Sequence, residues 1–347
     1  MRHRIGLIAD VQYADIDDVW NFTKTHKRKY RSTLTCLRNA VELWSSLPNL
    51  KLLLDLGDAI DGFKNTNREM GMHALQKVLV EWARLNPTLP ICHLIGNHEL
   101  YKFSREELIK GVESTGFNCA APPSLLVRSD PLNSINYTFN LSQGSSWRIV
   151  ILDPYAESVM RNGGGRVGLE LTLDNGGLDP TFTQLCQQNN PNNILKATDY
   201  FAGLTGEVCR WSPFNGGLGK DQLVWLENTL RSACSQGEHV LIASHVIVHP
   251  KATPRENCHT LLWDYTEALD LIDRYDCVKL VVCGHAHHEG YHHCERSKVH
   301  HITVPSPLEA PDEVLEQTFG YLELDEAGEK AELVGYGWVT SRTLDLR

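Results

Sequence analysis

Five short apolar runs recur along the chain, and each ends in side chains that can bind a metal ion or transfer a proton. The runs cover residues 4–10, 50–58, 89–99, 239–245 and 278–287, and a sixth apolar run covers 147–153. Each run is short enough to be a buried strand. The runs therefore predict a central sheet, and the polar residues at their ends restrict what that sheet can carry.

Helical patterns separate these runs, at residues 27–47, 67–85, 219–234 and 261–275. Within the third pattern, Leu223, Leu226 and Leu230 recur at the spacing of one helix face. Because strands that alternate with helices form βαβ units, the sheet is predicted to contain parallel strand pairs. The C-terminal part instead predicts strands joined by a hairpin turn at "DEAGEK". The sequence thus indicates an α/β protein with a second, antiparallel-leaning sheet region.

Residues 155–218 differ from the rest because they are rich in Gly, Asn and Pro and show no sustained helix or strand period. A loop-rich segment of this length inside a compact protein is usually functional. We expect an insertion that faces the substrate, with a surface excursion that has no role as the alternative.

The overall charge is acidic, with a formal net charge of −10. Such a chain is not expected to bind long nucleic-acid duplexes or anionic membranes. No stretch approaches the roughly 20 apolar residues of a membrane span, and the start "MRHRIGLIAD" shows no export signal. Ten cysteines without a C-x-x-C pair are typical of a reduced compartment. We therefore expect a cytoplasmic protein.

The polar residues that follow the five runs are chemically similar. They are Asp10 and Gln12 after the first, Asp58 after the second, Asn97, His98 and Glu99 after the third, His245 after the fourth, and His285 and His287 after the fifth. In open α/β sheets the carboxyl ends of the strands are where ligands bind. We expect these side chains to share one site.

The candidate ligands are oxygen and nitrogen donors without a thiolate. This set favours Mn, Mg or Fe over structural zinc, which prefers cysteine-rich sites. Without His98 and Glu99, seven donors remain, which is more than one ion needs. Two ions about 3.5–4 Å apart and bridged by one carboxylate use them all. A structural-zinc interpretation of residues 280–294 is the alternative, and it would make the fold depend on the metal. Four neighbours are expected to form an ordinary polar loop or to contact substrate: His288, His292, His293 and Cys294.

The combined motifs resemble the calcineurin-like metallophosphoesterase superfamily. Its pattern, D-x-H, G-D, G-N-H-[DE], a lone H and G-H-x-H, is matched between residues 6 and 287, except that Gln12 replaces a histidine. The resemblance implies a four-layer α/β/β/α sandwich of two mixed β-sheets flanked by helices, formed by a single domain over 1–347. It also implies that Asp10, Gln12, Asp58 and His287 hold one divalent ion, that Asp58, Asn97, His245 and His285 hold the other, and that His98 is the catalytic acid near the leaving group.

Three further segments, "ADVQYAD", "FNGGLGKDQLVWL" and "WDYTEAL", are similar to the manganese-dependent ADP-ribose/CDP-alcohol diphosphatases. This narrower resemblance implies hydrolysis of ADP-ribose and of CDP-alcohols such as CDP-choline by a metal-bound hydroxide. The products would be a nucleoside monophosphate and a phosphorylated sugar or alcohol. The amide oxygen of Gln12 would make one ligand shell harder and favour Mn²⁺ or Mg²⁺ over Zn²⁺. We expect two divalent ions, most readily Mn²⁺, and Mg²⁺, Fe or Zn²⁺ as substitutes in vitro.

Residues that flank the motifs are candidates for substrate binding. They are Phe22, Tyr101, Phe103, Phe214, Asn215, Gly216 and Trp263, and for each ring a packing role is the alternative. The basic run Lys24, Lys27, Arg28, Lys29 and Arg31 is interpreted as a solvated helix face rather than a phosphate clamp. The expected partners are small nucleoside diphosphate derivatives, with neither nucleic acid nor membrane, and we expect a monomer.

Other functions are weaker interpretations of the same motifs. A cyclic-nucleotide phosphodiesterase or a phosphomonoesterase would use a similar metal site. The phosphoprotein branch typically reads G-D-x-x-D-R-G and R-G-N-H-E, whereas "GDAIDGF" and "IGNHE" lack both arginines. An inactive scaffold of the same fold would be expected to lose ligands, but His98 and a plausible ligand at every motif position are present.

Overall fold

The computed structural model describes most of the chain. The described residues are 2–21, 24–113, 115–125, 135–164, 166–167, 170–171, 177–196, 199–254 and 258–347. Phe22, one of the predicted substrate contacts, lies outside them. A search of the described helices finds none that is both long and apolar enough to cross a membrane.

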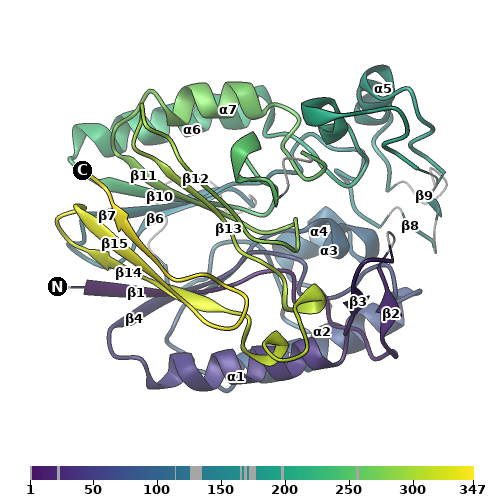
Figure 1. Cartoon of the computed structure of the whole chain (residues 1–347), viewed down its shortest axis with the longest axis horizontal. Coiled ribbons are helices and arrows are strands. Elements are labelled where there is room, and N and C mark those ends of the chain that lie inside the picture. The colour runs from purple at the N-terminus through teal and green to yellow at the C-terminus, as the bar shows by residue number, and fades with distance from the viewer. Residues whose placement is uncertain are drawn as a thin grey trace.

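Two six-stranded sheets form the centre of the molecule (Figure 1). The first consists, in spatial order, of β16 (Arg342–Asp345), β15 (Lys330–Gly335), β14 (Gly320–Asp325), β1 (Arg2–Ile8), β4 (Leu50–Asp55) and β5 (Ile91–His93). β1 lies parallel to β4 and antiparallel to β14, so this sheet is mixed. The β14–β15 hairpin turns at the predicted "DEAGEK" segment.

The second sheet is also mixed. In spatial order it consists of β12 (Gly290–His293), β13 (His300–Thr303), β11 (Val278–Cys283), β10 (His239–Ser244), β7 (Trp147–Ile151) and β6 (Tyr137–Asn140). β7, β10, β11 and β13 run parallel, and the edge strands β6 and β12 run antiparallel to their neighbours. The predicted βαβ order thus holds in both sheets.

The sheets pack face to face because successive residues of a strand point to opposite sides. In β4, Leu52 and Leu54 belong to the hydrophobic cluster between the sheets, whereas Leu53 faces the helical side. In β10, Leu241 faces the other sheet and Ile242 faces the helices. Strands that bury both faces read as continuous apolar runs, and this is the pattern seen in the sequence.

Helices cover the two outer faces (Figure 1). α1 (Ser32–Ser46) and α2 (Arg68–Trp82) cover the first sheet, and α6 (Gly219–Ser235) and α7 (Tyr265–Ile272) cover the second. The predicted four-layer α/β/β/α sandwich is thereby confirmed. Leu226 and Leu230 are fully buried beneath α6 as its periodicity predicts, while Leu223 is half-buried.

Short elements connect these layers. They are β2 (Val19–Trp20), β3 (Lys27–Arg28), α3 (Asn97–Lys102), α4 (Arg105–Lys110), β8 (Arg166–Val167), β9 (Glu170–Leu171), α5 (Pro180–Asn189), and the 3₁₀ turns η1 (Gly206–Arg210), η2 (Pro250–Ala252), η4 (Pro307–Glu309) and η5 (Leu315–Gln317).

Two of these short elements correct the sequence prediction. Lys27 and Arg28 lie in the β2–β3 hairpin and not on a helix face, because α1 begins only at Ser32. Helix α5 lies inside the segment 155–218, for which no regular period was predicted. Its start follows a standard pattern, since Asp179 caps the amides of Thr181 and Phe182 and Pro180 occupies the first helical position.

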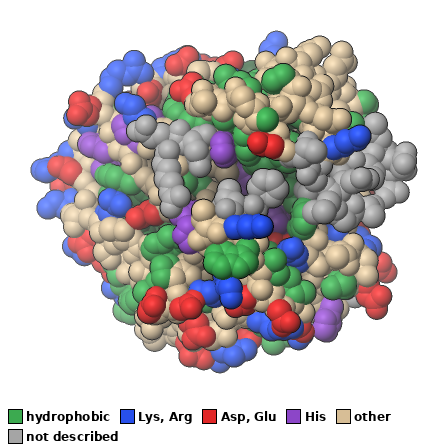
Figure 2. Space-filling model, turned by 45° about the vertical axis from the view of Figure 1, so that its right-hand side comes forward, with side chains coloured by type: hydrophobic (Ala, Val, Ile, Leu, Met, Phe, Trp, Pro, Cys, Tyr) green, Lys and Arg blue, Asp and Glu red, His purple; other side chains and the backbone are tan. Residues whose placement is uncertain are grey.

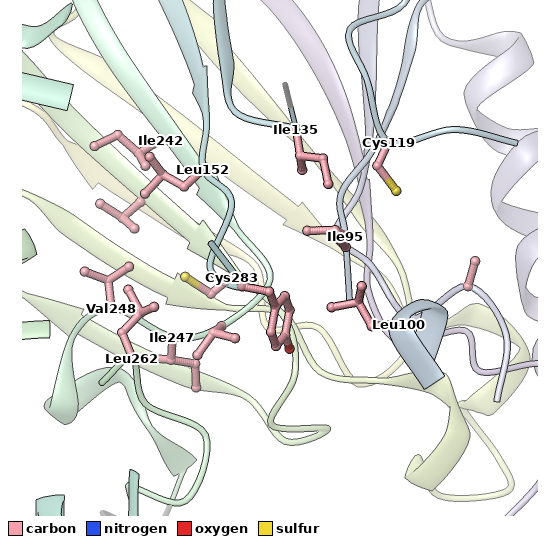
Figure 3. Packing of buried hydrophobic residues seen from close by; sticks show 14 of the residues in the cluster. Ile95, Leu100, Cys119, Ile135, Leu152, Ile242, Ile247, Val248, Leu262 and Cys283 are labelled. Atoms are coloured by element: carbon pink, nitrogen blue, oxygen red, sulfur yellow. The ribbon is translucent and has the colours of Figure 1, made fainter. Parts of the chain in front are cut away.

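Apolar side chains anchor the loops that follow the strands. Figure 3 shows Ile247, Val248 and Leu262 close together, and Ile95 close to Leu100. The first two follow β10 in the chain, and Ile95 precedes α3, which contains Leu100. All five side chains are at most 1% exposed. Buried apolar side chains therefore anchor the loops that carry the motif residues.

Candidate metal centre

The predicted ligands converge where the strands of the two sheets end. Asp58, 1% exposed, lies between the sheets: its Oδ2 atom is 3.2 Å from Gln12 Nε2 and 3.4 Å from His245 Nε2. Its Oδ1 atom accepts a hydrogen bond from the backbone N–H of His98 at 2.8 Å. Asp58 thus contacts residues of four of the five motifs, counting its own.

Asp10 connects the first motif with the fifth. Its Oδ2 atom accepts a 2.8 Å hydrogen bond from the backbone N–H of His285, and its Oδ1 atom lies 3.7 Å from His287 Nε2. Gln12 Nε2 lies 2.8 Å from the same His287 nitrogen. The oxygen and nitrogen of a side-chain amide can be exchanged by a 180° rotation. This rotation would place Gln12 Oε1 beside His287 Nε2.

His245 and His285 lie close together on the other side of Asp58. His245 Nδ1 donates to the carbonyl oxygen of Leu56 at 2.7 Å, so its Nε2 atom faces the site, 3.1 Å from His285 Nδ1. Ligand atoms of Asp58, His245 and His285 all lie within 4.8 Å of one another, a spacing that one ion can bridge.

Five predicted ligands have a left-handed backbone, which is costly for residues other than glycine. The φ angles are 52° for Asp10, 41° for Gln12, 58° for Asp58, 70° for His285 and 61° for His287. Each such residue costs on the order of 1–3 kcal/mol and persists where the surrounding structure enforces it. Backbone strain that is concentrated at the predicted ligands indicates a functional site.

Gly96 lies against the proposed bridging carboxylate. A Cβ atom at Gly96 would lie 2.0 Å from Asp58 Oδ1 and 2.6 Å from the Asp58 amide nitrogen. Glu99, fully buried, holds the same two loops together by accepting hydrogen bonds from the N–H groups of Gly96, Asp58 and Ala59. In the motif G-N-H-E, the glycine therefore allows the backbone to lie close to Asp58, and the glutamate holds the two loops together through backbone hydrogen bonds.

Asn97 reaches the site from α3 and lines its cavity. Its side-chain oxygen accepts a 3.3 Å hydrogen bond from the Tyr155 hydroxyl, and its Nδ2 donates to the Tyr101 hydroxyl at 3.0 Å. Two tyrosines thus fix the amide, and Tyr155 is a site residue that the sequence analysis does not identify. Its hydroxyl position is not marked by any motif.

The contacts of His98 define which ring nitrogen carries the proton. The backbone N–H of Gly62 donates to His98 Nδ1 at 3.0 Å. Because an N–H group can only donate, Nδ1 is unprotonated and the proton lies on Nε2, which faces Asp58 Oδ2 at 3.9 Å. Asp61, also missed by the sequence analysis, lies 3.6 Å from Nδ1. Burial lowers the pKa of His98, so the neutral ring is favoured.

A cavity of about 330 Å³ lies over these residues, and Figure 2 shows histidine side chains in and beside a hollow on this face. Gln12, Asp58, Asn97, His98, His285 and His287 line it. Arg28, Asn21 and Glu309 form another part of its wall. The volume is at the lower end of the range of small-molecule sites, about 300–1,000 Å³.

The predicted substrate contacts divide into two groups. Tyr101 and Phe214 line the cavity. Phe103 is fully buried in the hydrophobic core beneath Arg68, and Trp263, 4% exposed, packs against Trp211, so both occupy packing positions. Gly216 lies against backbone, where a Cβ atom would be 2.5 Å from the carbonyl oxygen of Pro154. Asn215 is fully buried and contacts His285.

Two of the remaining histidines of the 280–294 segment, His292 and His293, lie apart from this centre. His292 and His293 are on the edge strand β12, where they face His301 and His300. His288 lines the cavity beside its Ala286–His287 neighbours. One part of the segment therefore belongs to the candidate site and the other to a sheet edge. The position of His288 in the cavity wall is compatible with the predicted substrate contact.

Electrostatics favour a cation at this centre. Burial raises the pKa of Asp10 to about 6, because His245 and His287 offset the loss of solvent only in part. Burial opposes ionisation of Asp58 as well, but His245 and His98 lower the pKa of Asp58 below its ordinary range. Burial disfavours the charged form of His245, yet Asp58 and Asp10 raise its pKa to about 9. A proton on His245 thus provides the positive charge that a bound ion would supply in its place.

The donor set fits divalent ions on direct structural grounds. Among the described residues, Asp10 Oδ1 and Gln12 Oε1 are buried oxygens without a hydrogen-bond partner. His245 Nε2 and His285 Nδ1, 3.1 Å apart, need a proton or a cation between them. Buried groups of this kind are normally paired, so these atoms are well placed to hold metal ions.

Two mixed sheets with carboxylates and imidazoles at their strand ends define a metallophosphoesterase. The chain belongs to the Calcineurin-like phosphoesterase family, whose sequence profile matches residues 3–289.

The relatives are more specific. A Manganese-dependent ADP-ribose/CDP-alcohol diphosphatase from Xenopus tropicalis is 34% identical over 354 residues, which cover 99% of this chain and 94% of that protein. The Arabidopsis thaliana protein of the same name is 32% identical over 330 residues, which cover 95% of this chain and 93% of that protein. The crystal structure of a dimetal phosphatase from Danio rerio is similar with a TM-score of 0.80 and 30% identity, over 99% of both chains.

Removal of divalent ions with a chelator is expected to leave the fold intact. The predicted ligands lie on loops anchored by two hydrophobic clusters of described residues, and these clusters include none of the predicted ligands. Readdition of Mn²⁺ at 100 times its Kd should stabilise the protein by about 2.7 kcal/mol. Far-UV circular dichroism and thermal melts, each with and without Mn²⁺, measure both effects. Loss of helix and strand signal on chelation would instead support the structural-zinc interpretation.

Proposed function

We propose that this chain is a manganese-dependent diphosphatase that cleaves ADP-ribose and CDP-alcohols such as CDP-choline. The products would be a nucleoside monophosphate and a phosphorylated sugar or alcohol. The observation that carries the proposal is the near full-length similarity to proteins of that name. It is supported by the position of the predicted ligands: five line the cavity, and Asp10 and His245 contact members of that five. A Gln at position 12, where the wider superfamily pattern has His, agrees with a preference for Mn²⁺.

We assign the ligands as the motifs indicate. Asp58 would contact both ions, because it lies between Gln12 and His245. Asp10, Gln12 and His287 would complete one shell, and Asn97, His245 and His285 the other. Two bound divalent ions would supply polarisation of the phosphoryl oxygens and would lower the pKa of a water molecule.

The protein's own groups supply orientation and a proton. His98 presents Nε2–H to the cavity, so it can donate a hydrogen bond to the oxygen that leaves during cleavage. The backbone N–H of Gly62 keeps the other ring nitrogen unprotonated. Tyr101 and Phe214 provide aromatic surface on the cavity wall, and we assign it to the nucleoside part of the substrate.

The segment 155–218 contributes to this centre from outside the two sheets. Tyr155 contacts Asn97, Phe214 lies with its ring centroid 5.8 Å from that of His285, and Asn215 contacts His285 as well. These contacts support the proposal that the segment is part of the substrate-facing region of a single domain.

We further propose that the protein acts as a monomer in the cytoplasm on small substrates, and not on nucleic acids or membranes. All ten cysteines are free thiols, which agrees with a reducing compartment. The net charge of −10 agrees with the exclusion of large polyanions.

A substrate panel tests the proposed function. ADP-ribose, CDP-choline, CDP-glycerol, NADH, cyclic AMP and a phosphopeptide are each incubated with Mn²⁺ and with Mg²⁺, and nucleoside monophosphate release is measured by chromatography. We expect release from ADP-ribose and the CDP-alcohols, faster with Mn²⁺. Preferential turnover of cyclic AMP would support a phosphodiesterase instead, and no turnover of any compound would support the inactive scaffold.

A further inference from the structure

We propose that Asn215 and Glu309 are positioning residues, which hold His285 and His287 in the tautomers needed to bind one metal ion each. The inference rests on the function proposed above, because it takes these two histidines as ligands. Neither residue belongs to a metal motif, and the two come from different parts of the chain.

The orientation of the Asn215 amide is fixed by its surroundings. Its Nδ2 donates to the carbonyl oxygens of Arg210 at 2.8 Å and His259 at 2.7 Å. Carbonyl oxygens can only accept, so Nδ2 must point to them. The remaining atom, Oδ1, lies 2.8 Å from His285 Nε2. The amide is fully buried, so no solvent competes for these contacts.

This contact determines the state of His285. An amide oxygen can only accept, so His285 Nε2 carries the proton. The lone pair of the ring then lies on Nδ1, the atom that faces His245 Nε2 at 3.1 Å. A histidine of the opposite tautomer would present an N–H group to the centre and could not bind a metal ion there.

Glu309 acts on His287 in the same way. Its Oε1 atom lies 2.9 Å from His287 Nδ1. Arg28 Nε donates to the same oxygen at 2.8 Å, and Asn21 Nδ2 donates to Oε2 at 3.2 Å. Both oxygens of Glu309 therefore accept hydrogen bonds, and the Arg28 guanidinium places a positive charge beside them, so Glu309 is held as a carboxylate.

A carboxylate has no proton to give, so His287 Nδ1 is the donor. The lone pair of His287 then lies on Nε2, which faces Gln12 at 2.8 Å and Asp10 at 3.7 Å. Glu309 is 4% exposed and sits at the end of η4, where the Ser306 side chain caps the turn. The acceptor is therefore as rigidly held as the histidine that it orients.

Such partners fix ring orientation and raise ligand basicity, and their loss typically weakens metal binding by about 10–100-fold. The two residues differ in which ion they should affect. Asn215 acts on the shell of His245 and His285, and Glu309 acts on the shell of Gln12 and His287. A general loss of stability would affect both ions equally, so the selective pattern separates positioning from a structural role.

The experiment measures stepwise Mn²⁺ binding by titration calorimetry and Mn²⁺ electron paramagnetic resonance. Asn215→Ala is expected to weaken one of two Mn²⁺ sites by about 10–100-fold, and Glu309→Ala the other. Asn215→Asp keeps an oxygen that accepts from His285 Nε2, but its second oxygen would face the carbonyl oxygens of Arg210 and His259, so this variant should lower the melting temperature and still restore most of the Mn²⁺ affinity. Glu309→Gln keeps an oxygen that accepts from His287 Nδ1 and should restore most of the affinity of the other site. These conservative variants also keep the test available if an alanine variant fails to fold.

Two matched controls have side chains whose partners in the described structure include none of the predicted ligands. Asn190 is a fully buried amide of the same segment that donates to the carbonyl oxygens of Tyr200 and Trp211, and Glu81 is a buried carboxylate paired with Arg38 and Arg84. Asn190→Ala and Glu81→Ala should lower the melting temperature and leave both Mn²⁺ affinities unchanged.

The outcomes separate the two proposals. A wild-type protein that does not bind two Mn²⁺ ions would overturn the proposed metal centre itself. A wild-type protein that binds two, with alanine variants that leave both affinities unchanged or weaken both to the same extent, would overturn the positioning roles alone.

Discussion

Replacing Asp58 with asparagine is expected to lower kcat/KM for diphosphate substrates by at least about 10³-fold. Ligand-held cations contribute several kcal/mol to the stabilisation of charge in the transition state, and each 1.4 kcal/mol is about tenfold in rate. The substitution keeps the size of the side chain, so the effect reports on charge and not on a cavity.

The local contacts explain why the asparagine cannot substitute. Oδ1 of Asp58 accepts from the His98 backbone N–H, while Oδ2 faces Gln12 and His245. An amide has only one oxygen, so its NH₂ group must face either the His98 N–H group or the metal centre. In the first placement the NH₂ group meets another N–H donor, and in the second it meets a cation. Mn²⁺ binding should therefore fall together with activity.

Asp55 provides the matched control. It is also a 1% exposed carboxylate and is the last residue of β4, three positions before Asp58. Its side chain faces His93 Nδ1 at 2.8 Å, and in the described part of the chain it makes no hydrogen bond to a predicted ligand. Asp55→Asn should change stability while it leaves Mn²⁺ stoichiometry at two. If Asp58→Asn retained full activity and two bound ions, the bridging role would be wrong.

The convergence of the ligands could be predicted from the sequence because it depends on local features. Each apolar run encodes one strand, and each ligand follows its strand within a few residues, as Asp10 follows β1 and His285 follows β11. Parallel strands bring their carboxyl ends to one edge, so topology alone brings these side chains together. The stacking of the two sheets came from the family resemblance and not from periodicity.

Features that depend on distant contacts were not predictable. The basic run around Arg28 reads as helix, yet Arg28 lies in a hairpin and pairs with Glu309, 281 positions away. Asn215 was predicted to bind substrate as one of the residues that flank the motifs, through backbone N–H groups of its glycine-rich loop. In the structure it contacts His285, 70 positions away, and no local pattern encodes that partner.

The direction in which an aromatic ring points could not be predicted from the sequence either. Tyr101 and Phe103 are separated by one residue at the end of α3, and both were predicted to bind substrate. Both rings belong to the hydrophobic core, but only Tyr101 also lines the cavity, with its ring 5.1 Å from that of His98. The short helix ends between them, so neither a helix nor a strand period assigns their faces.

Replacing His98 with alanine is expected to slow hydrolysis of alkyl phosphodiesters more than hydrolysis of diphosphates. A positioned proton donor contributes about 10²–10⁴-fold when the leaving group needs the proton. An alkoxide is a strong base and needs it, whereas a departing phosphate is already a stable anion. We therefore expect a loss within that range for alkyl esters and a smaller loss for ADP-ribose and CDP-choline.

The structure makes the donor a neutral ring. The Gly62 N–H group occupies the lone pair of His98 Nδ1, so a second proton on that atom would meet a donor, and burial lowers the pKa further. His98 Nε2–H is thus available without prior protonation of the ring. A series of esters of one nucleotide with leaving groups of graded basicity should show a steeper dependence of rate on leaving-group basicity in His98→Ala than in the wild type.

Mn²⁺ binding provides the internal control for this comparison. His98 is outside the proposed ligand set, so His98→Ala should still bind two ions, and its deficit should appear in turnover alone. Equal losses across the whole ester series would contradict proton donation to the leaving group. They would assign His98 instead to a contact with the phosphoryl oxygens, which all of these substrates share.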